Sequence, residues 1–309
     1  MSFYLRQEHD LKDVLSDQRI LGSGLGPNSE LAILYTAVQN WQDMLEEWAT
    51  WRERARAMPP RERRRYQRQN PLVPLVRPAT VWLEGKGLFE MWLPMTCHGE
   101  VQALGAGGVL VLESGSCESI ARSIDAHGQD LHRFSLGGVG VNSLQVTGDE
   151  SVWVSYNEQT GYGKGWERLV QLDLHGELLF SYSEEMMNCD WLNVTKSGVW
   201  FKQNNHRDPP DKLVNISPDR SVREWEDFPR FRALLTHESE LLFLQHTGEL
   251  HVGRIDSGEL KYESWGVLSF RDQPGIPVRL QGNSPLVARN NRVCLIQDSF
   301  VYSMRFLGS

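Results

Sequence analysis

Two polar segments carry the residues of this sequence that could bind a ligand. The first follows a β-prone run at 152–156 and reads Asn157-Glu-Gln-Thr-Gly-Tyr-Gly-Lys-Gly-Trp166. Its glycines allow backbone conformations that other residues rarely adopt, and its aromatic rings combine apolar faces with hydrogen-bonding tips. The candidate ligand-binding residues here are Tyr156, Glu158, Tyr162 and Trp166. The alternative is a long hairpin whose rings pack on a neighbouring sheet.

The second polar segment reads Gln203-Asn-Asn-His-Arg-Asp-Pro-Pro210. A histidine beside carboxylates can act in acid–base chemistry or ligate a metal, although such clusters are commonly only solvated. The candidates are Asn204, His206, Arg207 and Asp208. Asp190, in Asn188-Cys-Asp-Trp191, begins a strand and could face an interior channel. An inward aspartate either serves a ligand or accepts hydrogen bonds from backbone amides.

A basic segment interrupts the β-prone pattern between residues 38 and 77. Trp41, Leu45 and Trp48 recur at the spacing of one helix face, and Pro60 can open a second helix. Residues 41–77 contain nine arginines and five acidic residues. The segment is either a helical hairpin with solvated arginines or a docking element for an acidic partner. The candidate partner-binding residues are Arg61, Arg63, Arg64, Arg65 and Arg68.

A repeated strand–turn–strand pattern predicts the fold. Its copies begin at residues 83, 124, 172, 216 and 255, each an aliphatic residue followed by a polar turn, an aliphatic residue and an aromatic one. Short β-prone runs precede these turns at 109–112, 152–156, 199–201 and 241–244, and the runs at 31–35 and 293–296 extend the series. A unit of roughly 40–50 residues that holds four strands is typical of a propeller blade.

The two ends of the chain complete this pattern. The last β-prone run has one strand after it, and residues 2–6 form an isolated strand-like segment. Pairing these two segments would remove exposed sheet edges. We therefore predict an all-β fold, a six-bladed β-propeller forming a single domain over 1–309, with a helical insertion at 38–77 in the first blade and closure by the N-terminal strand.

The composition of the chain limits the classes of partner that we expect. The net charge of −8 argues against a nucleic-acid-binding surface over the whole protein, and leaves 61–68 as the one basic stretch that could bind nucleic acid. No stretch resembles a signal peptide or a membrane-spanning segment, which predicts a cytoplasmic protein without membrane contact. Four scattered cysteines, Cys97, Cys117, Cys189 and Cys294, favour free thiols over a disulfide framework or a zinc site.

The stretch from Val141 to Trp225 resembles a set of bacterial propeller proteins without an assigned function. The residues that carry the resemblance are Ser143-Leu-Gln-Val146, Val152-Trp-Val-Ser-Tyr156 and Leu172-Asp-Leu-His-Gly176. More broadly, the chain is similar to NHL-like and gluconolactonase-like propellers. Enzymes of that superfamily hold a divalent metal with Glu, Asn and Asp in the central channel. We do not identify residues of the present sequence that correspond to these metal ligands. Ser217-Pro-Asp219 resembles a family tripeptide, but it falls in an outer turn.

The function predicted from these observations is a non-catalytic binding protein or protein-interaction scaffold. The sequence contains no Gly-x-Ser-x-Gly elbow and no phosphate loop, and we assign no catalytic residues, metal ligands or cofactor. The predicted partner is another protein, with an acidic surface as one option. Two alternatives stay open: a metal-dependent hydrolase or lactonase with ligands in the channel, and a lectin-like sugar binder that uses Tyr162 and Trp166.

Overall fold

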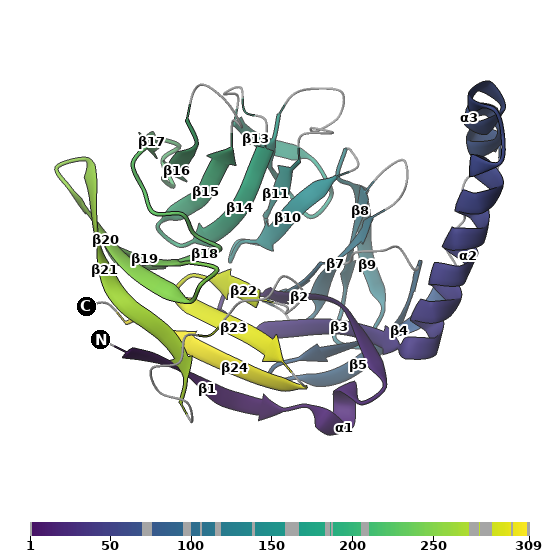
Figure 1. Ribbon diagram of the computed structural model, residues 1–309, viewed down its shortest axis with the longest axis horizontal. Coiled ribbons are helices and arrows are strands. Elements are labelled where there is room, and N and C mark those ends of the chain that lie inside the picture. Colours follow the sequence, from purple (N-terminus) through teal and green to yellow (C-terminus); the bar gives the residue numbers. More distant parts are fainter. Residues whose placement is uncertain are drawn as a thin grey trace.

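The structure is a computed structural model of the 309-residue chain. It describes residues 2–69, 76–94, 100–105, 107–114, 119–137, 140–157, 167–182, 186, 188–204, 210–271, 278, 286–297 and 299–307. Within them the chain is mostly β-structure, arranged in four four-stranded sheets and one eight-stranded sheet, with three helices (Figure 1). None of the helices in this described part is long and apolar enough to cross a membrane.

Four sheets each contain four consecutive strands. The first consists of β2 (Gln18–Leu25), β3 (Leu31–Ala37), β4 (Val76–Leu83) and β5 (Gly87–Pro94). The second consists of β6 (Val101–Ala103), β7 (Val109–Ser114), β8 (Ser119–Ile124) and β9 (Asp130–Ser135). The third consists of β10 (Val141–Val146), β11 (Val152–Tyr156), β12 (Leu169–Leu172) and β13 (Leu178–Tyr182). The fourth consists of β14 (Asn188–Thr195), β15 (Gly198–Asn204), β16 (Lys212–Ile216) and β17 (Val222–Trp225).

The remaining strands form one eight-stranded sheet in the order β18-β19-β20-β21-β1-β24-β23-β22. One half consists of β18 (Ala233–His237), β19 (Glu240–Leu244), β20 (Glu249–Asp256) and β21 (Glu259–Phe270). The other half consists of β22 (Leu286–Arg289), β23 (Arg292–Gln297), β24 (Phe300–Arg305) and β1 (Ser2–Asp10). The N-terminal strand is therefore shared by the two halves of this sheet.

The β-prone runs seen in the sequence are the second strands of these four-strand units. β11 is buried along its whole length and β3 along all but its last residue, because these strands have a sheet neighbour on both edges and other sheets against both faces. The strands that precede them, β2, β6, β10, β14, β18 and β22, contact one another in that order, and β22 contacts β2. The six first strands thus enclose the centre of the molecule (Figure 1).

The polar turns of the repeat are held by aspartate side chains. Asp125 Oδ1 accepts the backbone N–H groups of His127 and Gln129, and Asp173 Oδ1 accepts those of His175 and Glu177. The glycine that follows, Gly128 or Gly176, has a φ of 81° or 87°, a conformation that glycine adopts without a steric penalty. This local chemistry explains why an Asp-x-x-Gly signal recurs between the outer strands.

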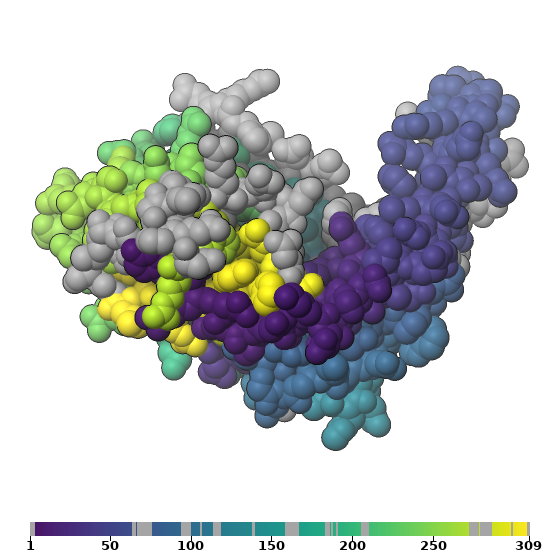
Figure 2. All heavy atoms as spheres, turned by 60° about the horizontal axis from the view of Figure 1, so that its bottom comes forward, coloured from purple at the N-terminus to yellow at the C-terminus, as the bar shows by residue number. Residues whose placement is uncertain are grey.

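The N-terminal strand joins the two ends of the chain. Residues Ser2 to Leu5 pair in parallel with β21, and Arg6 to Asp10 pair antiparallel with β24. The space-filling view shows this strand, in purple, beside the yellow C-terminal strands (Figure 2). Leu5 is buried in the same apolar cluster as residues of β18, β23 and β24, so the pairing is supported by packing as well as by backbone hydrogen bonds.

Three helices accompany the sheets. The short helix α1 (Lys12–Leu15) follows β1, whereas α2 (Val38–Arg56) and α3 (Pro60–Gln69) lie between β3 and β4. The first turns of α2 pack on the sheets, since Met44 is buried and Trp41 lies against the same apolar cluster. The rest of α2 and α3 extends away from the body as an arm (Figures 1 and 2). We call residues 38–69 the helical arm.

An arginine from β22 crosses the centre and binds residues of four other units. The Arg289 side chain is almost fully buried, and its Nε donates to the Val194 carbonyl at 3.2 Å. Its NH1 donates to the Leu25 carbonyl at 2.9 Å and to Gln102 Oε1 at 3.4 Å, and its NH2 donates to the Val146 carbonyl. One guanidinium therefore ties β22 to β2, β10 and β14 and to a side chain of β6.

Replacing this guanidinium should destabilise the whole fold. Arg289→Met keeps a long side chain but leaves buried carbonyl groups without donors, and each such group costs about 1–3 kcal/mol. Because the substitution also removes a buried charge, we expect a net loss of about 2–4 kcal/mol of unfolding free energy. Urea denaturation followed by circular dichroism measures this loss. Exposed Arg230→Met is the matched control, and equal midpoints for the two variants would contradict a central role.

Candidate functional site

A polar cavity of about 280 Å³ lies among the first strands. Every one of the six first strands, or the residue that precedes it, contributes to its wall, which includes Ser23, Glu100, Asn142, Ser143, Trp191, Arg232 and Ala288. Its volume is close to the lower end of the range for small-molecule sites. Residues from all six of these strand units, as far as the structure describes them, therefore line one small cavity.

Glu100 is the acidic group of this wall. It precedes β6, and its Oε2 accepts the backbone N–H of Leu144 on the neighbouring β10 at 2.7 Å. Burial raises the pKa of Glu100 to about 8, because desolvation disfavours the charged form more than the hydrogen bond favours it. The side chain keeps some contact with the cavity, yet no cation among the described residues forms an ion pair with it. Near neutral pH it is therefore largely a protonated donor.

The amide side chains of the wall are fixed by the strands behind them. Gln145 on β10 donates to the Leu192 carbonyl at 2.8 Å and accepts the Val194 N–H at 2.8 Å, so both ends of its amide bind β14. Asn142 donates to Asn188 Oδ1 at 3.1 Å and to the Cys189 carbonyl at 2.9 Å. These bonds align β10 with β14 and set the positions of the polar atoms before any ligand arrives.

Close approach of two first strands limits the cavity on one side. A Cβ on Gly24 of β2 would lie 2.0 Å from the Val101 carbonyl oxygen and 2.2 Å from the side-chain nitrogen Nε2 of Gln102. Only glycine fits this contact. Further along the strands, Arg289 binds Leu25, Gln102, Val146 and Val194, which lie at or just beyond the cavity-lining residues of their strands. The arginine thus fixes the strands next to the cavity-lining residues.

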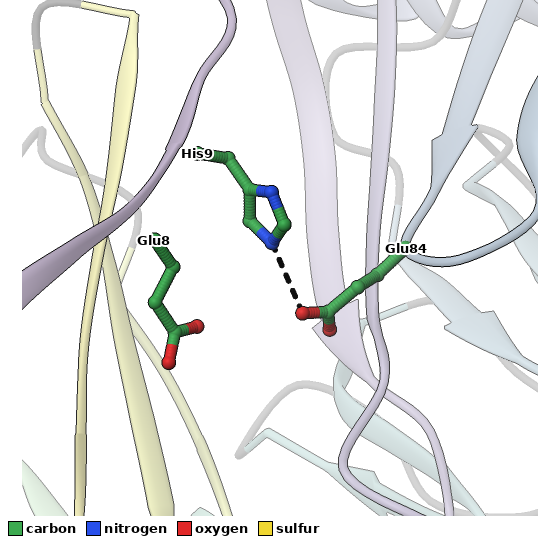
Figure 3. Close-up of side chains that lie close together, drawn as sticks. All are labelled: Glu8, His9 and Glu84. Atoms are coloured by element: carbon green, nitrogen blue, oxygen red, sulfur yellow. Dashed lines mark hydrogen bonds and ion pairs between the residues drawn. The ribbon is translucent and has the colours of Figure 1, made fainter.

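A second polar cluster joins β1 to the first sheet. Glu84 Oε1 lies 3.1 Å from His9 Nε2, and Glu8 points toward the same space (Figure 3). The ligand atoms of these three residues lie within 4.8 Å of one another, a spacing that could suit a metal ion. However, the guanidinium of Arg292 contacts both Glu84 oxygens, at 2.7 and 3.0 Å, and also contacts Glu8.

The contacts of Arg292 indicate that this cluster stabilises the fold and does not bind a metal ion. The arginine compensates the carboxylates that a cation would need, and the Glu84 carboxylate is also bound by the Leu31 N–H at 2.9 Å. Despite opposing desolvation, hydrogen bonds from Arg292, Leu31 and His9 lower the pKa of Glu84 to about 2. An exposed acidic group without such partners would be a better metal ligand. We therefore interpret the cluster as the attachment of β1 to the turn after β4.

Several residues predicted as ligand-binding lie elsewhere or outside the described residues. Tyr156 is a correction: its ring is fully buried in the core of the second and third sheets and its hydroxyl donates to the Leu136 carbonyl, so it cannot contact a ligand. Asn204 ends β15 and is half-buried. Asp190 belongs to β14, but its side chain is outside the description. The residues that lie outside the described part of the chain are Glu158, Tyr162, Trp166, His206, Arg207 and Asp208.

The predicted partner-binding arginines belong to α3. Arg61 is exposed, whereas Arg63 donates from Nε to the Ala55 carbonyl at 3.0 Å and from NH2 to the Arg56 and Met58 carbonyls. Arg63 therefore caps the C-terminus of α2, a role that the sequence analysis did not foresee. The side chains of Arg64, Arg65 and Arg68 are outside the description, although their backbone is helical.

Sequence reasoning missed the cavity residues. Glu100, Asn142 and Gln145 were not among the predicted ligand-binding residues, because the sequence signals for binding lay in the long loops and the charged segments. A signal was available for two of them: Glu100 directly precedes β6 and Asn142 is the second residue of β10, just as Asp190 lies near the beginning of β14, whereas Gln145 lies further along β10. Aligning the units on their first strands, as well as on their outer turns, would have brought these polar positions together.

Comparisons with known proteins support the fold. No protein-family model and no curated protein matches the sequence. Among solved structures, Hsv2 of Kluyvelomyces marxianus matches at a TM-score of 0.50 with 7% identity, over 90% of this chain and 73% of that one. The Cps50 (Swd1) β-propeller domain of Myceliophteria thermophila matches at 0.49 with 7% identity, over 93% and 84%. A gluconolactonase of Xanthomonas campestris matches at 0.48 with 13% identity, over 98% and 94%.

The matching solved structures include a β-propeller domain and a gluconolactonase, the kinds of protein that the sequence resembles. At these identities the likeness concerns the fold, and it assigns no chemistry to the cavity. Function has to be argued from the residues of this chain.

The raised pKa of Glu100 predicts a specific pH dependence of stability. Between about 4.5, its ordinary pKa, and about 8, the folded protein keeps a proton that the unfolded chain releases, so stability falls as pH rises through this window. Glu100→Gln should remove this slope and be the more stable protein at pH 9, by about 2–4 kcal/mol. Urea titrations from pH 4 to 9 test this, with exposed Glu249→Gln as control. Parallel pH profiles for wild type and Glu100→Gln would contradict it.

Proposed function

We propose that the chain is a six-bladed β-propeller, closed by its N-terminal strand, that acts as a non-catalytic binding protein and holds a small polar molecule in the central cavity. The observation that carries the proposal is the convergence of all six first strands on one polar cavity, next to the strand contacts that Arg289 makes. Four-stranded units in succession, with their first strands in a circle, support the count of six blades.

The wall favours a ligand that is polar but carries no net charge. Glu100 and Arg232 contribute one ionisable group of each sign, and Glu100 is largely protonated near neutral pH. Asn142, Gln145 and Ser143 add amide and hydroxyl groups, and Trp191 adds an aromatic surface. A small polyhydroxylated molecule meets these requirements, since it offers hydrogen-bonding groups on several sides and C–H faces that pack on an aromatic ring.

Support for binding without catalysis comes from the same wall. Among its described residues, Glu100 is the only carboxyl group, and neither histidine nor cysteine contributes. Hydrolysis normally uses two positioned groups or an activated nucleophile, and a catalytic metal normally needs three protein ligands. A wall with one carboxylic acid and several fixed amides is better suited to holding a ligand than to transforming one.

A ligand screen tests this proposal. Neutral monosaccharides, polyols and sugar lactones are titrated into the protein by calorimetry and thermal denaturation. A ligand at 100 times its Kd should stabilise the fold by about 2.7 kcal/mol, which raises Tm by several degrees. Ser143→Phe should abolish the shift by filling the cavity, whereas Ser239→Phe, on an exposed turn, should not. Lactone opening that depends on Glu100, or a stoichiometric metal lost in Glu100→Gln, would contradict a non-catalytic role.

The helical arm supports a second candidate function, protein interaction. The arm extends from the body and is anchored chiefly at its first turns (Figure 2). Leu45 is 40% exposed, Trp48 is half-buried with Arg52 4.8 Å from its ring centre, and α3 carries five arginines and one glutamate. A basic projection on a protein of net charge −8 suits a partner with an acidic surface.

Charge reversal on α3 tests the role of the arm. Arg61, Arg64 and Arg65 are changed to Glu together, and Arg63 is kept because it caps α2. Recovery of an acidic partner by affinity purification at about 150 mM salt should be lost, while Tm changes by less than about 2 °C, since α3 lies on the arm and apart from the core of the sheets. Reversing Arg223 and Arg230, two exposed arginines of the body, is the control. Equal recovery with the α3 triple variant would disprove the role.

A further inference from the structure

A second hollow lies at the seam where β1 joins the two halves of the eight-stranded sheet. Its volume is about 590 Å³, and its wall includes Tyr4, Arg6, Glu8, Arg271, Ser303 and Arg305. We call it the seam hollow. It is separate from the central cavity, with which it shares no lining residue. Three of its polar residues are arginines, which is unusual for a hollow on a protein of net charge −8.

The strand register brings these arginines together from three segments. Arg6 lies directly opposite Ser303 in the pairing of β1 with β24, and Arg305 follows two residues later on the same face of β24. Arg271 follows the last residue of β21, and its backbone N–H donates to the Leu5 carbonyl at 3.3 Å. The three guanidinium groups therefore depend on the closure of the sheet by β1.

The positive charges of the seam hollow have no protein counter-ion among the described residues. Arg6, Arg271 and Arg305 are all exposed, and none of them forms an ion pair within that part of the chain. The one carboxylate of the wall, Glu8, is already paired with the buried guanidinium of Arg292. Like charges that share a concave surface repel one another, and a bound anion relieves this repulsion.

We propose that the seam hollow binds a small phosphomonoester. Arginine forks match the geometry of a phosphate group and bind it with charge-assisted hydrogen bonds. The hydroxyl groups of Tyr4 and Ser303 add neutral hydrogen-bonding partners, and the volume leaves room for an attached organic group of a few atoms. Because the arginines come from both sides of the seam, the ligand also favours the closed form of the sheet.

Calorimetric titration of the full chain with glycerol 3-phosphate, inorganic phosphate, sulfate and acetate tests the proposal. We expect the two phosphates to bind more tightly than acetate and to weaken as salt rises. Arg271→Gln and Arg305→Gln should each weaken phosphate binding about tenfold or more, since each removes a charged donor. Arg230→Gln, on the exposed body, should leave it unchanged. Tighter binding of glycerol 3-phosphate than of inorganic phosphate indicates an esterified ligand. The reverse order indicates that the ligand is free phosphate, and it overturns the proposal of a phosphomonoester.

A charge variant of opposite sign separates binding from folding defects. Glu8→Gln removes the only carboxylate of the described wall, so phosphate affinity should rise a few-fold. A variant that merely unfolds cannot produce a gain. The proposal is overturned if no heat or Tm shift accompanies about 10 mM glycerol 3-phosphate, a concentration at which a millimolar Kd would saturate. It is also overturned if Arg271→Gln and Arg305→Gln, still folded by circular dichroism, bind as wild type does.

Discussion

The buried guanidinium of Arg289 is the interaction on which the centre of the molecule depends. It has no carboxylate partner within hydrogen-bonding distance among the described residues, so backbone carbonyl dipoles of three other units stabilise its charge. Burial lowers its pKa to about 10, which still leaves it protonated near neutral pH. The carbonyl groups belong to segments as far as 264 residues away in sequence. One side chain therefore joins segments that are far apart in the sequence, in addition to the contacts between neighbouring first strands.

The turn that carries Arg289 also organises the closure. Asn290 donates from Nδ2 to Ser29 Oγ at 3.1 Å, and its backbone N–H donates to Asn193 Oδ1 at 2.9 Å. Arg292 then binds Glu84 and Glu8, and so attaches β1 and the first sheet to the start of β23. Because the pKa of Glu84 is lowered to about 2, this attachment contributes stability above its ordinary pKa of about 4.5 and loses it as pH falls toward 2. This contribution to closure is thus fully present above about pH 4.5.

The sequence predicted what depends on local patterns and missed what depends on distant contacts. The second strands were found as apolar runs, the outer turns as Asp-x-x-Gly signals, and helices occur at 38–56 and 60–69 where Trp41, Leu45 and Pro60 indicated them. Glu100, Arg289 and Arg292 were missed, because their importance comes from burial next to segments tens to hundreds of residues away. Tyr156 was misjudged for the same reason: an aromatic residue before a loop does not reveal that its ring points into the core.

The central cavity is shaped by bonds that exist without a ligand. Gln145 uses both ends of its amide on β14, and Arg289 binds carbonyl groups of three neighbouring strands, so the wall cannot rearrange without breaking contacts between units. Such a site is preorganised, and a ligand that fits it loses little free energy to ordering the protein. In the proposed function, selectivity follows from the positions of fixed amides and one protonated carboxyl group. A charged ligand would require Glu100 to ionise or to move, and both cost free energy because Glu100 is desolvated. Burial of Glu100 therefore disfavours charged ligands.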